Sequence, residues 1–177
     1  MDLKKFFLSL IIFSGLILPA IAQEKGYPVP TGNRNQLFYL QRTPNTNTVV
    51  YELNYKDGAF DLENPVHEFW IRYQEKGERK ELSYIQRKFA YGIKARKIGA
   101  NRYELSIVAY KKYKMYLELG SDNRYNVYSI INQKKVILTS IFLRINGGSF
   151  WSPNVEFIDL AGIEPASRAV VKERLKL

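Results

Sequence analysis

The chain has 177 residues, no cysteine, and 27 lysines and arginines against 17 aspartates and glutamates, a formal net charge of +10. Without cysteine it cannot be a disulfide-stabilised scaffold, so its stability must come from the burial of apolar side chains. The positive charge favours anionic partners, such as phospholipid headgroups, acidic glycans or nucleic acid, although a net charge far from zero also keeps a protein dispersed in water.

The first 22 residues have the pattern of a cleaved export signal. Two lysines at positions 4 and 5 precede an uncharged, mostly apolar run over 6–18, and the Ala-Ile-Ala at 20–22 is a small-x-small cleavage pattern. The apolar run is shorter than the ~20 residues that a membrane-spanning helix needs. We therefore expect cleavage after Ala22, a periplasmic or secreted protein with no transmembrane span in the mature chain, and a single β-rich domain over 23–177.

The first part of the mature chain is rich in aromatic and β-branched residues. Residues 36–42 and 47–55 predict two strands, and the Thr-Pro-Asn-Thr turn between them predicts a hairpin. Residues 56–66 contain glycine, proline and several Asp and Asn residues, which predicts a loop, and 67–74 predicts a third strand.

The pattern changes over residues 79–97. Leu82, Ile85, Phe89 and Ile93 recur at spacings of three and four residues, which predicts one apolar helical face. Gly92 disfavours helix by about 1 kcal/mol, so the helix is expected to end or bend there.

Alternation with a period of two returns after Gly99 and predicts the remaining strands. These cover 103–109, 113–119, 125–132, 135–145 and 155–160, while the tail over 163–177 gives no prediction. The segment 136–145 is apolar on both faces until Arg144, which predicts a central strand, and the Asn-Gly-Gly at 146–148 is expected to end it. The fold class expected is mainly β (β-rich α+β), with an antiparallel meander sheet curled into a half-barrel or sandwich and one inserted helix at about residues 79–97.

The residues that carry chemistry do not form a known catalytic set. His67 is the one histidine, no second histidine completes an H-E-x-x-H motif, and no G-x-S-x-G motif is present. We therefore predict no catalytic residue, no metal and no cofactor, and expect His67 at a strand end or on the surface. Acidic residues around one loop and strand leave open a paired acid/base site or a solvated loop; they are Asp57, Asp61, Glu63, Glu68 and Glu75.

A short pattern occurs twice, as Tyr-Leu-Gln-Arg at 39–42 and Tyr-Ile-Gln-Arg at 84–87. Arginine is the bidentate donor suited to carboxylate, phosphate or sulfate. One hypothesis is that Arg42 and Arg87 converge on an anion; the alternative is that both pair with carboxylates and fasten the helix to the sheet. The candidate ligand-binding residues are Gln41, Arg42, Tyr84, Gln86, Arg87, Tyr91 and Trp151.

Two other segments are distinctive. The loop over 146–154 (NGGSFWSPN) places Phe150 and Trp151 either against a sugar ring or acyl chain, or as a plug at one end of the sheet. Residues 110–116 (YKKYKMY) interleave lysines with aromatics, as single-stranded nucleic-acid surfaces do, but an ordinary strand with outward lysines is the favoured interpretation. Export argues against nucleic acid as a partner.

Several segments resemble a secreted bacterial family, domain of unknown function 4833. They are GYPVPTGNRNQLFYLQRTPNTNTVVYELNY, FWIRYQEKGERKELSYIQRKFAYGIKAR, IVAYKK and INGGSFWSPNVEFIDLAG, which lie within 26–162. The resemblance implies export and a single domain, and it implies no activity.

The function expected from the sequence is a non-enzymatic periplasmic or envelope binding module for an apolar or anionic ligand. One alternative is a hydrolase that acts on envelope glycan or lipid through carboxylates near residues 57–75. Another is a structural envelope protein that docks on a partner. The expected partners are accordingly an envelope lipid, an acidic glycan or an envelope protein.

Overall fold

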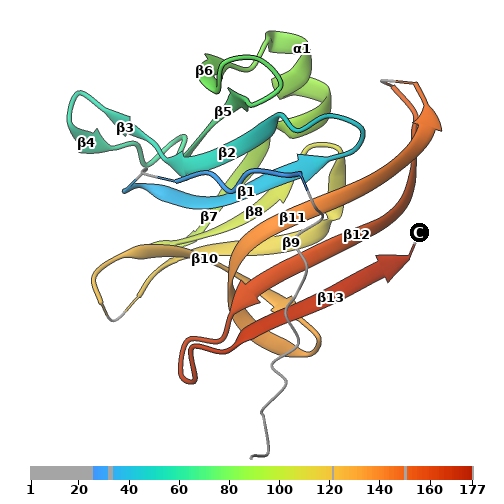
Figure 1. Cartoon of the computed structure of the whole chain (residues 1–177). Coiled ribbons are helices and arrows are strands. Elements are labelled where there is room, and N and C mark those ends of the chain that lie inside the picture. Colours follow the sequence, from blue (N-terminus) through green and yellow to red (C-terminus); the bar gives the residue numbers. More distant parts are fainter. Residues whose placement is uncertain (1–25, 32–33, 121, 150, 177) are drawn as a thin grey trace, which may run out of the picture.

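The computed structural model describes residues 26–31, 34–120, 122–149 and 151–176, and most of them lie in β-strands (Figure 1). The predicted export signal lies outside these residues. The strands are β1 (Gln36–Arg42), β2 (Thr48–Leu53), β3 (Tyr55–Lys56), β4 (Ala59–Phe60), β5 (Val66–Arg72), β6 (Glu78–Glu81), β7 (Ile93–Gly99), β8 (Arg102–Ile107), β9 (Tyr110–Leu119), β10 (Tyr125–Ile131), β11 (Lys134–Gly148), β12 (Pro153–Ile163) and β13 (Val170–Lys176). A helical segment, α1 (Tyr84–Gln86) followed by the π-helical turn η1 (Arg87–Tyr91), connects β6 to β7.

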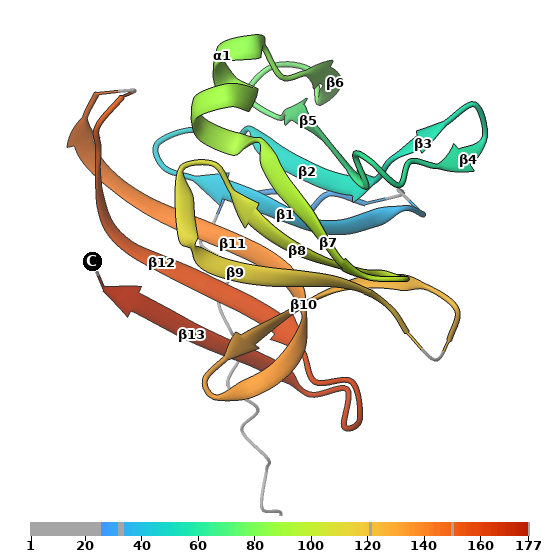
Figure 2. The same ribbon diagram turned by 180° about the vertical axis from the view of Figure 1, so that it is seen from behind.

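The described strands form one 11-stranded sheet and the small β3–β4 hairpin. The sheet runs β6-β5-β2-β1-β11-β10-β9-β8-β7, and β12 and β13 extend it from the other edge of β11. Strand β11 is the branching point, because residues 134–137 pair with β10 and residues 140–143 pair with β1 along the same edge. The sheet therefore folds over on itself, and Figures 1 and 2 show the β5-β2-β1 part facing the β7–β10 part.

The core fills the space between these two parts. Phe38 and Tyr51 are fully buried, and their rings stack with centroids 4.3 Å apart. Opposite them lie buried side chains of β8 and β9, including Leu105 and Met115, while Leu138 contributes from β11. The predicted fold class is confirmed, and burial of this kind replaces the disulfides that the chain cannot form.

The helix is much shorter than the predicted 79–97. Residues 78–81 form β6 and 93–99 form β7, both at edges of the sheet. The spacing of apolar residues was misleading, because Leu82 is buried while Ile85 and Phe89 are exposed. A local signal does mark the start: Ser83 accepts a hydrogen bond from the Gln86 backbone, and the Gln86 side chain accepts one from the Ser83 backbone, which is a capping box.

Three further features differ from the sequence-based prediction. The β1–β11 pair is parallel, so the sheet is mixed and not a pure antiparallel meander. The predicted loop over 56–66 contains part of the β3–β4 hairpin, and the tail supplies strand β13. Strand β11 is central, as predicted from its apolar faces, but it continues through the Asn-Gly-Gly at 146–148.

Candidate functional site

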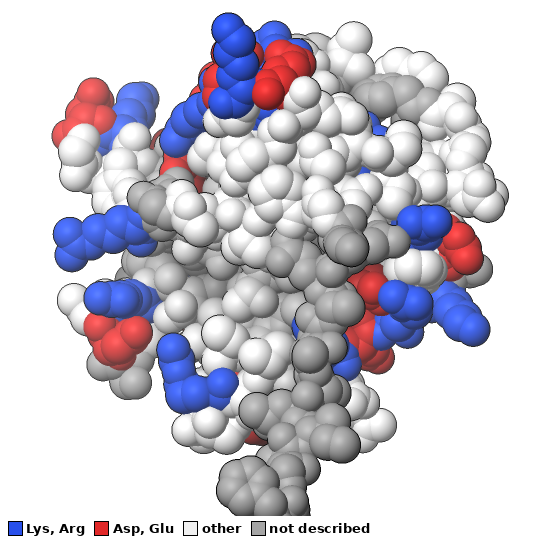
Figure 3. All heavy atoms as spheres, viewed as in Figure 1, with Lys and Arg blue, Asp and Glu red and all other residues white. Residues whose placement is uncertain are grey.

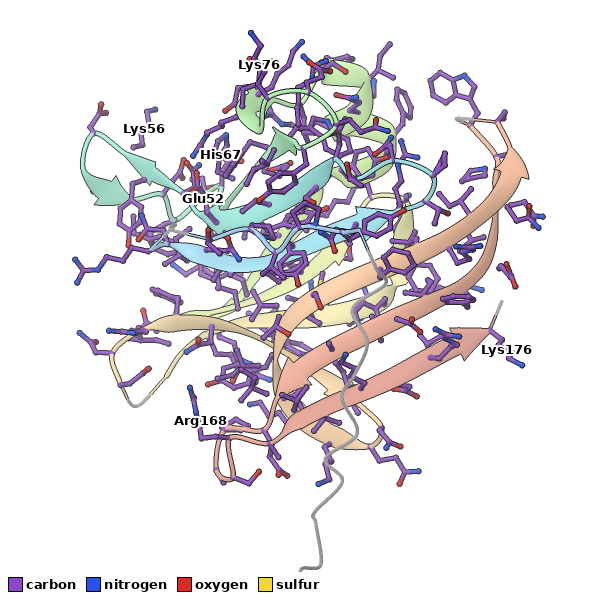
Figure 4. All side chains as sticks on the ribbon, in the orientation of Figure 1. Glu52, Lys56, His67, Lys76, Arg168 and Lys176 are labelled. Atoms are coloured by element: carbon purple, nitrogen blue, oxygen red, sulfur yellow. The ribbon has the colours of Figure 1, made fainter. Side chains whose placement is uncertain are left out.

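A hollow of about 750 Å³ lies on the outer face of β2, β5 and β6, the face turned away from the core. Its wall contains the ionisable side chains Glu52, His67 and Arg79. Asn35, Asn54, Tyr55 and Phe69 line it as well, so the wall is mainly polar with aromatic faces. Figure 4 shows Glu52 and His67 side by side on the neighbouring strands β2 and β5, close to the β3–β4 hairpin.

Strand register brings these residues together. Glu52 pairs with His67 across β2 and β5, and Ile71 pairs with Arg79 across β5 and β6. Because alternate residues of a strand point to the same face, His67, Phe69 and Ile71 all face the hollow. Side chains from three strands thus meet at one place, although they are far apart in the sequence.

Direct contacts fix the orientation of the Glu52, His67 and Arg79 side chains. The Nδ1 atom of His67 lies 3.1 Å from Glu52 Oε1, and its Nε2 lies 2.8 Å from Glu81 Oε2. Arg79 donates from one terminal nitrogen to Glu52 Oε1 at 2.7 Å, and that nitrogen lies 3.2 Å from His67 Nδ1. The Arg79 guanidinium also stacks 3.6 Å above the Phe69 ring. The polar groups are therefore held in place before any ligand arrives.

Charges in this region are almost balanced. The side chain of Glu52 is only 11% exposed and is held by Arg79, whereas Glu81 is 57% exposed and also contacts Arg87 at 3.3 Å. Arg87 reaches Glu68, on the other face of β5, at 3.6 Å. Burial raises the pKa of Glu68, and Arg87 opposes that rise. Figure 3 shows cations and carboxylates interspersed at the end of the molecule where β5, β6 and α1 lie.

The described residues contain no group of three or more His, Asp or Glu side chains arranged to hold a metal ion. At His67, the two ring nitrogens face different carboxylates. An ion bound to one nitrogen would have only one of these carboxylates beside it, whereas a stable site needs several converging ligands.

Comparison with known families gives one match. The family described as Domain of unknown function (DUF4833) matches residues 38–174. The chain belongs to this family. Searches of curated proteins and of solved structures found no match. Within the described residues of this DUF4833 protein, no helix is long and apolar enough to cross a membrane.

Gln41 and Arg42 do not share a site, because they lie on opposite faces of β1. Gln41 is buried and donates to the Pro28 carbonyl at 2.7 Å and to Thr48 Oγ1 at 3.0 Å, which fastens the segment before β1 to the sheet. Arg42 faces the helix, where its Nε donates to the Tyr91 hydroxyl at 2.6 Å.

Trp70 contacts two residues of the helical segment, Gln86 and Tyr91, and Tyr91 in turn contacts Arg42. The Trp70 indole donates to Gln86 Oε1 at 3.3 Å, and its ring meets the Tyr91 ring edge-on at 5.0 Å. We call Arg42, Trp70, Gln86 and Tyr91 the helix anchor. Arg87 has separate partners in Glu68 and Glu81. These contacts fasten the helix to the sheet, and the convergence of two arginines on one anion stays a prediction.

Tyr84 and Trp151 lie at the surface, with exposed fractions of 71% and 66%. Trp151 contacts Phe89 of the helix, with ring centroids 5.4 Å apart. Its exposure does not fit the alternative in which this residue plugs the end of the sheet. Phe150, the other aromatic of that loop, lies outside the described residues.

Three of the five carboxylates predicted between residues 57 and 75 have structural partners, namely Asp61, Glu68 and Glu75. Asp61 accepts hydrogen bonds from the backbone of Glu63 and Asn64, and hydrogen bonding to this backbone is the main cause of its lowered pKa. Glu75 pairs with Arg72. Sequence reasoning did not predict Glu52, Arg79 and Glu81 as site residues, because their proximity depends on the register of strand pairing. The alternating charges of Glu-Arg-Lys-Glu at 78–81 were the one available signal.

Proposed function

We propose that this protein is a non-catalytic binding module of the bacterial cell envelope, and that its hollow binds an uncharged, hydroxyl-rich ligand such as a saccharide ring. The observation that carries the proposal is the fixed set of planar polar groups, Glu52, His67 and Arg79, on the wall of a hollow of about 750 Å³. That volume lies within the roughly 300–1,000 Å³ typical of small-molecule sites.

The chemistry of the wall suits hydroxyl groups. A sugar hydroxyl both donates and accepts hydrogen bonds; carboxylates accept, a guanidinium donates, and the amides of Asn35 and Asn54 do both. Tyr55, with 48% of its surface exposed, offers a ring face on which the apolar side of a sugar can rest.

Charge and polarity favour this ligand over the apolar or anionic one expected from the sequence. Arg79, the cation of the wall, is already paired with Glu52, and a second carboxylate, Glu81, lies beside His67. An anion would therefore meet two carboxylates. An apolar ligand would cover Glu52 and Arg79 without replacing their contacts with water, which is unfavourable.

The same geometry favours binding over hydrolysis. A glycosidase needs two carboxyl groups with the scissile bond between them, about 5–9 Å apart. Here the His67 ring occupies the space between Glu52 and Glu81 and contacts both carboxylates. The pair thus lacks the room that a glycosidic bond and a water molecule require.

The test is a titration followed by ¹H–¹⁵N NMR, with the methyl glycosides of glucose, galactose, mannose and N-acetylglucosamine as probes. Binding should shift the amide resonances of Asn54 and Gly77, which line the hollow. Free energies near −4 kcal/mol correspond to a dissociation constant of about 1 mM, so the titration extends to ~10 mM. Citrate and phosphate serve as anionic probes.

Variants locate the site. Arg79→Met and His67→Gln should abolish the shifts, whereas Lys80→Ala, the matched control on the opposite face of β6, should leave them unchanged. The proposal is wrong if no glycoside shifts the hollow's amides, if citrate binds there more tightly than the glycosides, or if a glycoside is cleaved.

A further inference from the structure

An exposed aromatic patch lies apart from the hollow. We define the aromatic patch as Tyr84, Ile85, Phe89 and Trp151, whose exposed fractions are 71%, 47%, 49% and 66%. These are four of the ten large apolar residues exposed in the described part of the chain. Such residues are ordinary on a surface when scattered, but a cluster indicates an interaction site.

Two distant segments build the patch. Tyr84, Ile85 and Phe89 come from the helical segment, and Trp151 comes from the connection between β11 and β12. The Phe89 and Trp151 rings meet edge-on with centroids 5.4 Å apart. Figures 1 and 2 show the helix and the β11–β12 tip at the same end of the molecule, and the tip projects beyond the sheet. The patch therefore joins the helix to the end of the β11–β12 hairpin.

Lys88 places a positive charge directly at the patch. Lys88 Nζ lies 5.2 Å and 5.3 Å from the Tyr84 and Phe89 ring centroids and donates to the Tyr84 hydroxyl at 2.9 Å. No carboxylate of the described residues pairs with this lysine. The helical segment 84–91 (YIQRKFAY) contains two cations and no acid, and the loop over 146–154 has no charged residue.

We propose that the aromatic patch docks the protein onto the surface of a bilayer that contains anionic phospholipids. Tryptophan and tyrosine have an apolar ring with a polar tip, and this combination concentrates at the headgroup level of membranes. A lysine at the same level is attracted by anionic headgroups. Exposed rings suit this occupant, because lipids rearrange around an inserted ring whereas a protein surface must offer a matching hollow.

The size of the patch argues against a second copy of the chain or another protein. Stable protein interfaces use roughly 20–30 residues on each side. The patch has four large side chains, which is too few for such an interface but sufficient for peripheral attachment to lipid. This proposal does not depend on the ligand of the hollow.

The experiment measures co-flotation of the protein with vesicles of phosphatidylcholine alone and with vesicles that contain one-quarter phosphatidylglycerol. Trp151 provides an internal probe, because Trp70, the other tryptophan, is 8% exposed while Trp151 is 66% exposed. Binding should shift the fluorescence emission to shorter wavelength on the anionic vesicles. Lipids brominated in the upper acyl chain should quench it.

Three variants and a control assign the effect to the patch. Trp151→Ala and Phe89→Ala should each lower partitioning at least tenfold, and Lys88→Ala should lower it about fivefold on anionic vesicles only. Ile130→Ala removes a side chain of similar exposure (59%) on β10 and should bind as the native protein does. Equal thermal midpoints confirm that the variants are folded.

The proposal is overturned if the native protein fails to float with anionic vesicles, or if Trp151→Ala floats as well as the native protein. It is also overturned if sedimentation velocity without lipid reveals a dimer that Trp151→Ala abolishes, since a second copy would then cover the patch.

Discussion

The contact between Arg42 and Tyr91 offers the sharpest test of what the repeated Gln-Arg residues do. The Arg42 Nε donates to the Tyr91 hydroxyl at 2.6 Å and connects β1 to the end of the helix. Tyr91 is buried at 9% exposure, while Arg42 is partly exposed. The perturbation is a double-mutant cycle of Tyr91→Phe, Arg42→Met and the two combined.

The expected magnitude follows from burial. Hydrogen bonds that involve a charged group contribute about 1.5–3 kcal/mol. Water can reach the partly exposed guanidinium after its partner is removed. Tyr91→Phe should therefore lower the free energy of unfolding by about 1.5 kcal/mol, the lower end of this range. For a chain of this size that corresponds to a decrease in melting temperature of about 3–6 °C. The coupling energy between the two substitutions should be about 1 kcal/mol.

Urea denaturation monitored by circular dichroism gives the four free energies of unfolding. Additive effects, with a coupling energy below ~0.3 kcal/mol, would contradict the anchoring role. The competing hypothesis, an anion held by Arg42 and Arg87, makes a different prediction. In that case phosphate would raise the melting temperature of the native protein by mass action, and the increase would vanish in Arg42→Met.

Three further predictions concern a closely packed glycine and two buried ionisable side chains. Gly162→Ala places a Cβ 2.5 Å from a valine side chain of β11 and should lower stability by about 1–3 kcal/mol, whereas Gly99→Ala, with 3.5 Å to its nearest neighbour, should be tolerated in thermal denaturation. Burial raises the pKa of Tyr51 well above 10.0, so the unfolded chain releases this proton first as the pH rises. Stability should therefore fall above pH 10 in urea titrations, and less steeply in Tyr51→Phe. Burial also raises the pKa of Glu68 above 4.5, against the effect of Arg87. The ionised carboxylate is thus unfavourable in the folded state, so the native protein loses stability as the pH rises from 4.5 through the raised pKa of Glu68. Over the same pH range, Glu68→Gln should become more stable relative to the native protein.

Local sequence patterns predicted most of the sheet, because the alternation of apolar and polar residues along a strand reflects which of its side chains are buried. In β8 the alternation around Tyr103 and Leu105 corresponds to side chains that are buried in the structure. The central position of 135–145 was predictable for the same reason, since residues on both faces of that strand are apolar. The hairpin of β1 and β2 followed from its turn residues.

The helix was overpredicted because an edge strand and a helix can carry similar residues. Glu78–Glu81 is entirely exposed, so it lacks the alternation that reveals a half-buried strand. In Ile93–Gly99 only Ile93 and Ala95 are partly buried. Contacts with neighbouring strands, and not local preference, decide the structure of such segments.

The hollow could not be predicted because it depends on register across three strands. Glu52 and His67 are neighbours only because β2 and β5 pair with the loop 54–65 between them, and Arg79 joins through a third strand. A shift of one residue in either pairing would move one of these side chains to the opposite face. No local pattern in a single sequence specifies that register.

The helix anchor explains how so short a helix can hold side chains both beside the hollow and in the aromatic patch. An isolated helix of this length is unstable in water, so its position is set by its contacts with the sheet. Through Arg87 it reaches Glu81 beside the hollow, and through Phe89 it meets Trp151 in the aromatic patch. Arg42 and Trp70 hold both ends of the segment, at Tyr91 and at Gln86. Arg42 and Gln86 of the repeated Gln-Arg pattern thus position the helix, and the exposed side chains that the helix carries are the ones available to partners.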